Sequence, residues 1–156
     1  MKLGDLVFFK GKGFVSKVIS LLTNSPYTHV AIAVSDTEIL EADVFIKSRI
    51  RTLNKEDVYC VMRYENLTEQ QLNFIKNECY NSIGISYDYF QVFLWSLRLI
   101  FKYKKGVVNN ANKEYCSELV DRIYYEAGVV LLPNALEGDC TPAQLLDSPL
   151  LTKIQN

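Results

Sequence analysis

The sequence is poor in several residues that often mark a particular function. It has one histidine and one tryptophan in 156 residues, and its four cysteines, at positions 60, 79, 116 and 140, form no Cys-x-x-Cys pair. This pattern excludes a zinc ribbon and a thioredoxin-type redox motif, so we expect no metal and no cofactor. Lysine plus arginine (17) nearly balance aspartate plus glutamate (18). The net charge of -1 therefore gives no reason to expect a nucleic-acid partner.

A membrane-spanning segment is also missing from the sequence. The apolar stretch 89–101 is interrupted by Gln91 and Arg98 and is too short to cross a bilayer. It reads as a buried amphipathic helix, with an apolar wall of a substrate site or a lipid-contacting surface as alternatives. No apolar signal core follows Met1 and Lys2, so a cytoplasmic chain with reduced thiols is predicted. Release by lysis, a phage origin and an intracellular substrate are the alternatives for how such a chain would meet its substrate.

The remaining composition is that of an ordinary globular protein. Hydrophobic residues make up 49% and charged residues 22%, and the length suits one domain with a real core. The sequence predicts a single α+β domain over residues 1–156. Apolar periodicity and turn residues predict strands over 3–9, 28–34, 38–44 and 58–64, and helices over 14–25, 68–81 and 116–128. The segment 138–151 is expected to pack back on this body.

The only histidine lies at the start of a predicted strand. Because side chains alternate along a strand, His29 shares a face with Ala31 and Ala33, while Val30 and Ile32 lie on the other. The small alanines leave room for another element near the imidazole. A histidine satisfied by a single hydrogen bond is the ordinary alternative at such a position.

The next predicted strand supplies acidic partners for this histidine. A three-residue loop at 35–37 places Glu41 opposite Ala31 and Asp43 opposite His29, with both carboxylates on the histidine's face and Glu41 diagonal to it. A two-residue loop would reverse the faces. A carboxylate that holds one ring nitrogen leaves the other to act as a base.

One of the four cysteines stands in a position that favours reactivity. Cys60 lies in a strand, Cys79 lies late in a helix and Cys140 lies in a loop, whereas Cys116 opens an amphipathic helix. The helix dipole and free amides at a helix N-terminus stabilise a thiolate, and the same amides stabilise an oxyanion. The alternative for Cys116 is a small buried hydrophobic residue.

The order of these motifs resembles that of a known family, the circularly permuted NlpC/p60 papain-like enzymes, in their YiiX-like branch. Histidine comes first and cysteine late, as also in the lecithin retinol acyltransferase group. Thr28 stands where serine is common in the branch. The resemblance covers nearly the whole chain and rests on Gly4-Asp5-Leu6-Val7, Tyr27-Thr28-His29-Val30-Ala31-Ile32, Leu40-Glu41-Ala42, Tyr87-Asp88 and Tyr115-Cys116-Ser117-Glu118-Leu119-Val120.

The resemblance implies a permuted papain-like α+β fold, in which a central antiparallel sheet packs against helices. It also implies catalytic roles: Cys116 as nucleophile, His29 as general base and Glu41 as the residue that orients the imidazole. Tyr87 and Tyr27 correspond to positions near the substrate.

The implied activity is that of a thiol peptidase or amidase that cleaves an amide bond in a peptide or peptidoglycan-derived substrate through a thioester. The alternatives are a lipid acyltransferase or thioesterase that uses the same residues, and a binding module without turnover.

Overall fold

The structure is a computed structural model, and it describes residues 1–11, 14–43, 46–54, 57, 59–85, 116–133 and 140–155. Tyr87, the apolar stretch 89–101 and the polar loop before Cys116 lie outside the described residues. The predictions made for them stay predictions.

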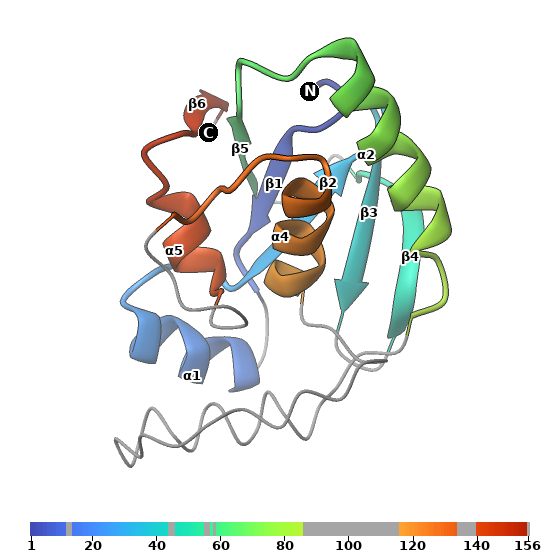
Figure 1. Cartoon of the computed structure of the whole chain (residues 1–156). Helices are drawn as coiled ribbons and strands as arrows, with labels where there is room; N and C mark the ends of the chain where they lie inside the picture. The colour runs from blue at the N-terminus through green and yellow to red at the C-terminus, as the bar shows by residue number, and fades with distance from the viewer. Residues whose placement is uncertain are drawn as a thin grey trace, which may run out of the picture.

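The predicted α+β class with a central antiparallel sheet is confirmed (Figure 1). Six strands pair in the order β4-β3-β2-β1-β5-β6, and every pair is antiparallel. Their bounds are β1 (Leu6–Phe9), β2 (His29–Ala33), β3 (Glu38–Asp43), β4 (Ile46–Thr52), β5 (Tyr59–Arg63) and β6 (Thr152–Gln155).

Two of these strands, β4 and β6, were not predicted. Strand β4 has the sequence IKSRIRT, in which Lys47, Arg49 and Arg51 alternate with less polar residues. That period of two is the signature of a strand, but three cations in seven residues obscure its apolar face. Strand β6 has four residues near the end of the chain, too few for a periodic pattern. The two missed strands form the two edges of the sheet.

In the described part of the chain, four helices accompany the sheet: α1 (Phe14–Thr23), α2 (Glu69–Asn81), α4 (Cys116–Glu126) and α5 (Pro142–Leu146). The predicted cap of α2 is confirmed, because Thr68 and Gln71 form a capping box. Helix α4 begins at Cys116, as predicted. Gly128 follows its end at a φ of +81°, the left-handed conformation that a C-terminal glycine adopts without strain.

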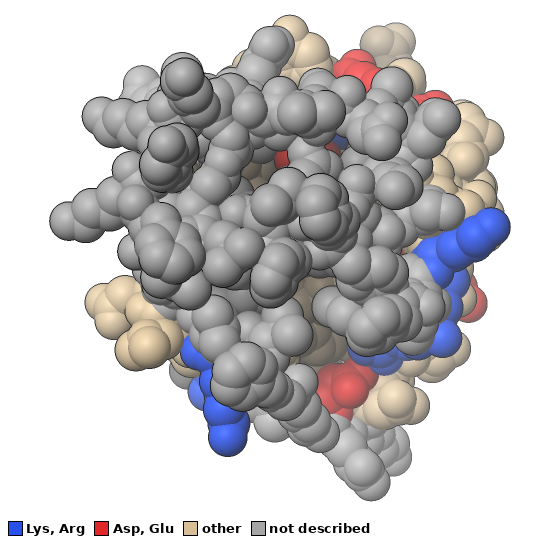
Figure 2. Space-filling view, turned by 90° about the horizontal axis from the view of Figure 1, so that it is seen from below, with Lys and Arg blue, Asp and Glu red and all other residues tan. Residues whose placement is uncertain are grey.

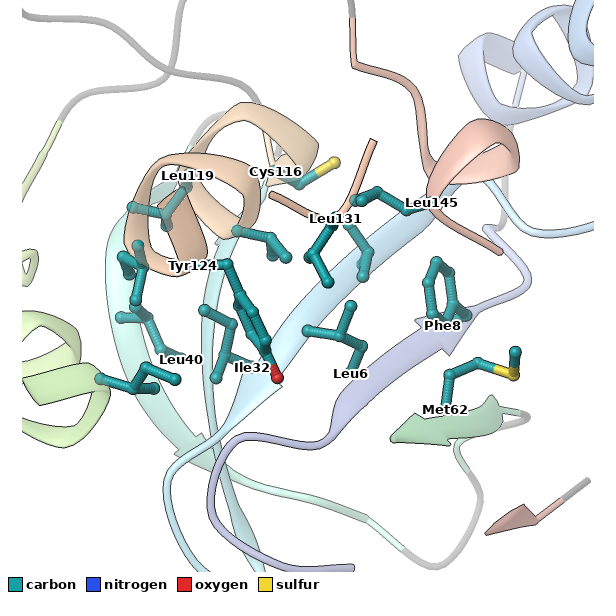
Figure 3. Close-up of a cluster of buried hydrophobic side chains, with 14 of the residues drawn as sticks. Leu6, Phe8, Ile32, Leu40, Met62, Cys116, Leu119, Tyr124, Leu131 and Leu145 are labelled. Atoms are coloured by element: carbon teal, nitrogen blue, oxygen red, sulfur yellow. The ribbon is translucent and has the colours of Figure 1, made fainter. Parts of the chain in front are cut away.

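The sheet has two buried faces, each with its own apolar cluster. Helix α4 packs over β2 and β3, with α2 beside it, on what we call the helix face (Figure 1). Figure 3 shows its apolar cluster, which includes Leu6, Phe8, Ile32, Leu40, Leu119 and Tyr124. The opposite face carries an apolar group and a set of ion-paired residues, Glu41, Arg49 and Arg51, so we call it the charged face. Its apolar residues are Val7, Phe9, Ala31, Ala33 and Ile39.

The Gly-Asp motif near the start of the chain has a structural role. Asp5 is 1% exposed and accepts two hydrogen bonds from Arg63, at 2.7 and 2.9 Å. Gly4 has a φ of +86°, and a Cβ there would meet Leu67 Cδ1 at 2.9 Å. The motif therefore joins β1 to β5 and to the start of α2.

Candidate active site

The hairpin of β2 and β3 brings the histidine and a carboxylate together. Ile32 pairs with Leu40, and the amide of Val34 donates to the carbonyl of Glu38 at 2.9 Å, which confirms the predicted register. His29 Nε2 lies 3.6 Å from Glu41 Oε2. This distance is long for a hydrogen bond, so the contact is chiefly electrostatic.

Glu41 is held as an anion although it is buried. Its side chain is only 4% exposed, and burial by itself raises the pKa of a carboxyl group. The close approach of His29, the hydrogen bond from Arg51 and the positive charges of both residues outweigh burial and lower the pKa of Glu41 to about 2. The residue is therefore a carboxylate at any physiological pH, and it faces the imidazole as a negative charge.

Two arginines that the sequence analysis missed complete the surroundings of Glu41. Arg49 stands directly opposite Glu41 in the β3–β4 pair, and its Nη2 donates to Oε1 at 3.1 Å. Arg51 Nε lies 2.9 Å from the same oxygen. The sequence signal that could have revealed these arginines is the alternation of cations in β4. An antiparallel partner of β3 places one of its residues opposite Glu41.

Aromatic packing fixes the histidine ring on the charged face. The rings of Phe9 and His29 have centroids 5.7 Å apart, and the side chain of His29 is 15% exposed. The Arg51 guanidinium lies 5.5 Å from the Phe9 ring, which means that this side chain reaches from β4 to β1 across two strands. The small side chains of Ala31 and Ala33 are compatible with that path.

Cys116 lies at the same end of the sheet but belongs to the other face. Helix α4 begins where β2 begins and β3 ends (Figure 1). Figure 3 shows Cys116 in the first turn of α4; its side chain joins the helix-face cluster with Val30 and Ile32 and is 5% exposed. His29 contacts Glu41 and Phe9, which lie on the charged face.

The other three thiols have environments that suppress reactivity. Burial raises the pKa of Cys60, raises that of Cys79 to about 12 and raises that of Cys140 further. A thiolate is the nucleophilic form of cysteine, so these three residues are poor nucleophiles near neutral pH. All four cysteines are free in the structure. Cys116 stays the candidate nucleophile because of its position at the start of α4.

Of the other predicted site residues, the structure describes the surroundings of Tyr27. Tyr27 is half-buried against the helix-face cluster, with Lys10 Nζ 5.7 Å from its ring. A cavity of about 510 Å³ next to α1 reaches Thr28, the neighbour of His29. Acidic and basic side chains occur side by side on the surface at this end of the molecule (Figure 2). The side chain of Asp43 is outside the described part.

The fold of this chain is similar to that of a known protein. It superimposes on the crystal structure of YiiX from Escherichia coli O157:H7 with a TM-score of 0.69 and 20% identity, covering 99% of this chain and 97% of the other. The fold is therefore that of YiiX. No family model matches the sequence.

A curated relative shares more of its sequence over a shorter span. It is described as probable lipoprotein peptidase YaeF from Escherichia coli (strain K12), and it is 35% identical over 95 residues. The match covers 54% of this chain and 35% of the relative, so this chain aligns with about a third of that protein.

The solved YiiX structure is described as that of a metalloprotein. In the described part of the present chain, no three histidine, cysteine, aspartate or glutamate side chains gather as ligands for a metal ion. Of the helices described here, none has the length and apolar character needed to cross a membrane.

Proposed function

We propose that this protein is a cysteine hydrolase of the peptidase or amidase type. The observation that carries the proposal is an ionised Glu41 facing Nε2 of the only histidine, at the end of the sheet where Cys116 opens α4. The name of the partial relative, a probable lipoprotein peptidase, favours the same class of reaction. The bond attacked would be an amide in a peptide or peptidoglycan-derived substrate.

In this proposal the two ring nitrogens of His29 have different tasks. Nε2 faces the carboxylate, so Nδ1 is the nitrogen that exchanges a proton with the thiol. His29 is the first residue of β2 and Cys116 the first of α4. In this proposal their side chains meet around the strand end rather than across the sheet.

The reaction follows the usual course for a thiol nucleophile. His29 takes the thiol proton, and the Cys116 sulfur attacks the amide carbonyl carbon while the amides at the start of α4 stabilise the oxyanion. The imidazolium then gives its proton to the leaving amine, and a thioester remains. His29 next deprotonates a water molecule that attacks the thioester, which releases the carboxylic acid and the thiol. Glu41 orients the ring and takes no proton.

The test is a substrate panel of peptides, muropeptides and acyl esters, assayed with the wild-type chain, Cys116→Ser and Cys140→Ser. Cys140 is the matched control, because its carbonyl accepts a hydrogen bond from Ser117 at 2.6 Å and its thiol is buried beside the start of α4. We expect amide cleavage that Cys116→Ser abolishes and Cys140→Ser retains. Turnover of esters alone would favour the acyltransferase alternative, and binding without turnover would favour the binding module.

A further inference from the structure

The two oxygens of the Glu41 carboxylate have separate partners. Oε1 accepts hydrogen bonds from Arg49 and lies 2.9 Å from Arg51 Nε. Oε2 is the oxygen that faces His29. A guanidinium is planar and rigid, so it restricts the orientation of a carboxylate that it binds. The arginines of β4 therefore determine which way Glu41 presents Oε2.

Arg51 is the more firmly held of the two arginines. Its Nη1 donates to Asp57 Oδ2 at 2.8 Å, and that oxygen also accepts from the amide of Asn54 at 3.2 Å. Its guanidinium lies against the Phe9 ring, which in turn packs on His29. The side chain of Arg51 is 22% exposed, compared with 47% for Arg49.

We propose that Arg51 is a positioning residue of the candidate active site, which aims Oε2 of Glu41 at His29 and offsets the charge of that carboxylate. The catalytic role of Arg51 rests on the proposed function, because only a histidine that transfers protons in a reaction needs a particular proton affinity. A carboxylate without cations would stabilise the imidazolium strongly. A carboxylate shared with two guanidiniums holds that proton less tightly, so the proton can pass to a leaving amine.

Several charged or titratable groups among the described residues surround His29. They are Glu41 from β3, Arg49 and Arg51 from β4, Asp57 behind Arg51, Tyr59 from β5 beyond the Phe9 ring, and Cys116 from α4 at the same end of the sheet.

The single histidine gives a direct measurement. Its ring nitrogens can be followed by NMR against pH without assignment, in a Cys116→Ser background so that no thiolate titrates nearby. Arg51→Met removes the charge and keeps an apolar stem over Phe9. We expect it to raise the pKa of His29 by about one unit. Asp57→Asn removes an anion that neutralises Arg51, and it should lower that pKa.

Arg122→Met is the matched control. Arg122 is 28% exposed, pairs with Glu126 at 3.1 Å and donates to Ser82 Oγ at 3.0 Å, so it lies between α4 and the end of α2. It should leave the titration of His29 unchanged. The proposal is overturned if Arg51→Met shifts the pKa no more than Arg122→Met does, or if the Arg51 and Asp57 variants shift it in the same direction. Should Arg51→Met fail to fold by circular dichroism, Asp57→Asn decides, and an unchanged or raised pKa refutes the proposal.

A kinetic measurement separates this proposal from the proposed function. If the wild-type chain hydrolyses a panel substrate, Arg51→Met should lower kcat about tenfold with little change in KM. A change in KM alone would contradict a positioning role. If the wild-type chain hydrolyses nothing, the proposed function fails, whereas the NMR titration still tests the link from Arg51 to His29.

Discussion

The two faces of the central sheet are both buried, but different kinds of side chain line them. On the helix face, leucine and isoleucine side chains of the sheet pack with Tyr124 of α4 and Leu145 of α5. On the charged face, Ala31 and Ile39 are at most 1% exposed, yet their neighbours include Glu41 and Arg51. A buried charge is tolerated where it is paired and hydrogen-bonded. The helix face therefore supplies stability, while the charged face keeps groups that can do chemistry.

The largest effect expected concerns the link between the faces. If His29 and Cys116 act as a pair around the strand end, His29→Ala should abolish turnover and slow alkylation of Cys116 near neutral pH, because the imidazolium that stabilises the thiolate is lost. Iodoacetamide labelling followed by mass spectrometry, cysteine by cysteine and against pH, measures this. An unchanged apparent thiol pKa, or faster labelling of Cys60, Cys79 or Cys140 in the folded protein, would show that the faces are chemically separate.

The next effect separates the faces by stability. Ile32→Ala on the helix face should cost about 3 kcal/mol in the free energy of unfolding, because it leaves a cavity under α4. Arg49→Met on the charged face, with a side chain 47% exposed, should cost less than about 1 kcal/mol. Urea titrations followed by circular dichroism test both values. Equal costs would mean that the charged face is as important to stability as the core.

A smaller effect tests which carboxylate serves the histidine. Glu41→Ala should lower turnover on the order of 100-fold, because the imidazole loses the group that orients it. Glu41→Gln should retain more activity, since an amide still forms a hydrogen bond, and Asp43→Asn should be the mildest of the three. Turnover rates with circular dichroism as a control for folding decide the order. A dead Asp43→Asn with a nearly normal Glu41→Ala would transfer the role to Asp43.

The last effect, which appears only at acid pH, is a pH dependence that belongs to the charged face. Glu41 has a pKa of about 2 in the folded chain against 4.5 for a free side chain. A lowered folded pKa contributes stability that is fully present above pH 4.5 and is lost as the pH falls toward 2. Glu41→Gln should therefore lose less stability than the wild type over that window. Thermal unfolding across this pH range measures the difference, and parallel curves would contradict the assignment.

The secondary structure that sequence reasoning could find is the part with a strong local signal. Helix α2 has a capping box at Thr68, and α4 has an amphipathic pattern with a glycine after its end. The hairpin register followed from strand alternation and a three-residue loop, and with it the approach of Glu41 to His29. The edge strand β4 was not predicted, because cations alternate in it with small or apolar residues and hide its apolar face.

The amino-acid sequence by itself determined the α+β class, the face of β2 that carries His29 and the helix that begins at Cys116. These features depend on periods of two or 3.6 residues, which local side chains set. Only the tertiary structure decided that Arg49 and Arg51 close around Glu41 and that Cys116 belongs to the opposite face from His29. Those facts depend on which strands pair and on which face a helix packs, and long-range burial rather than local pattern determines both.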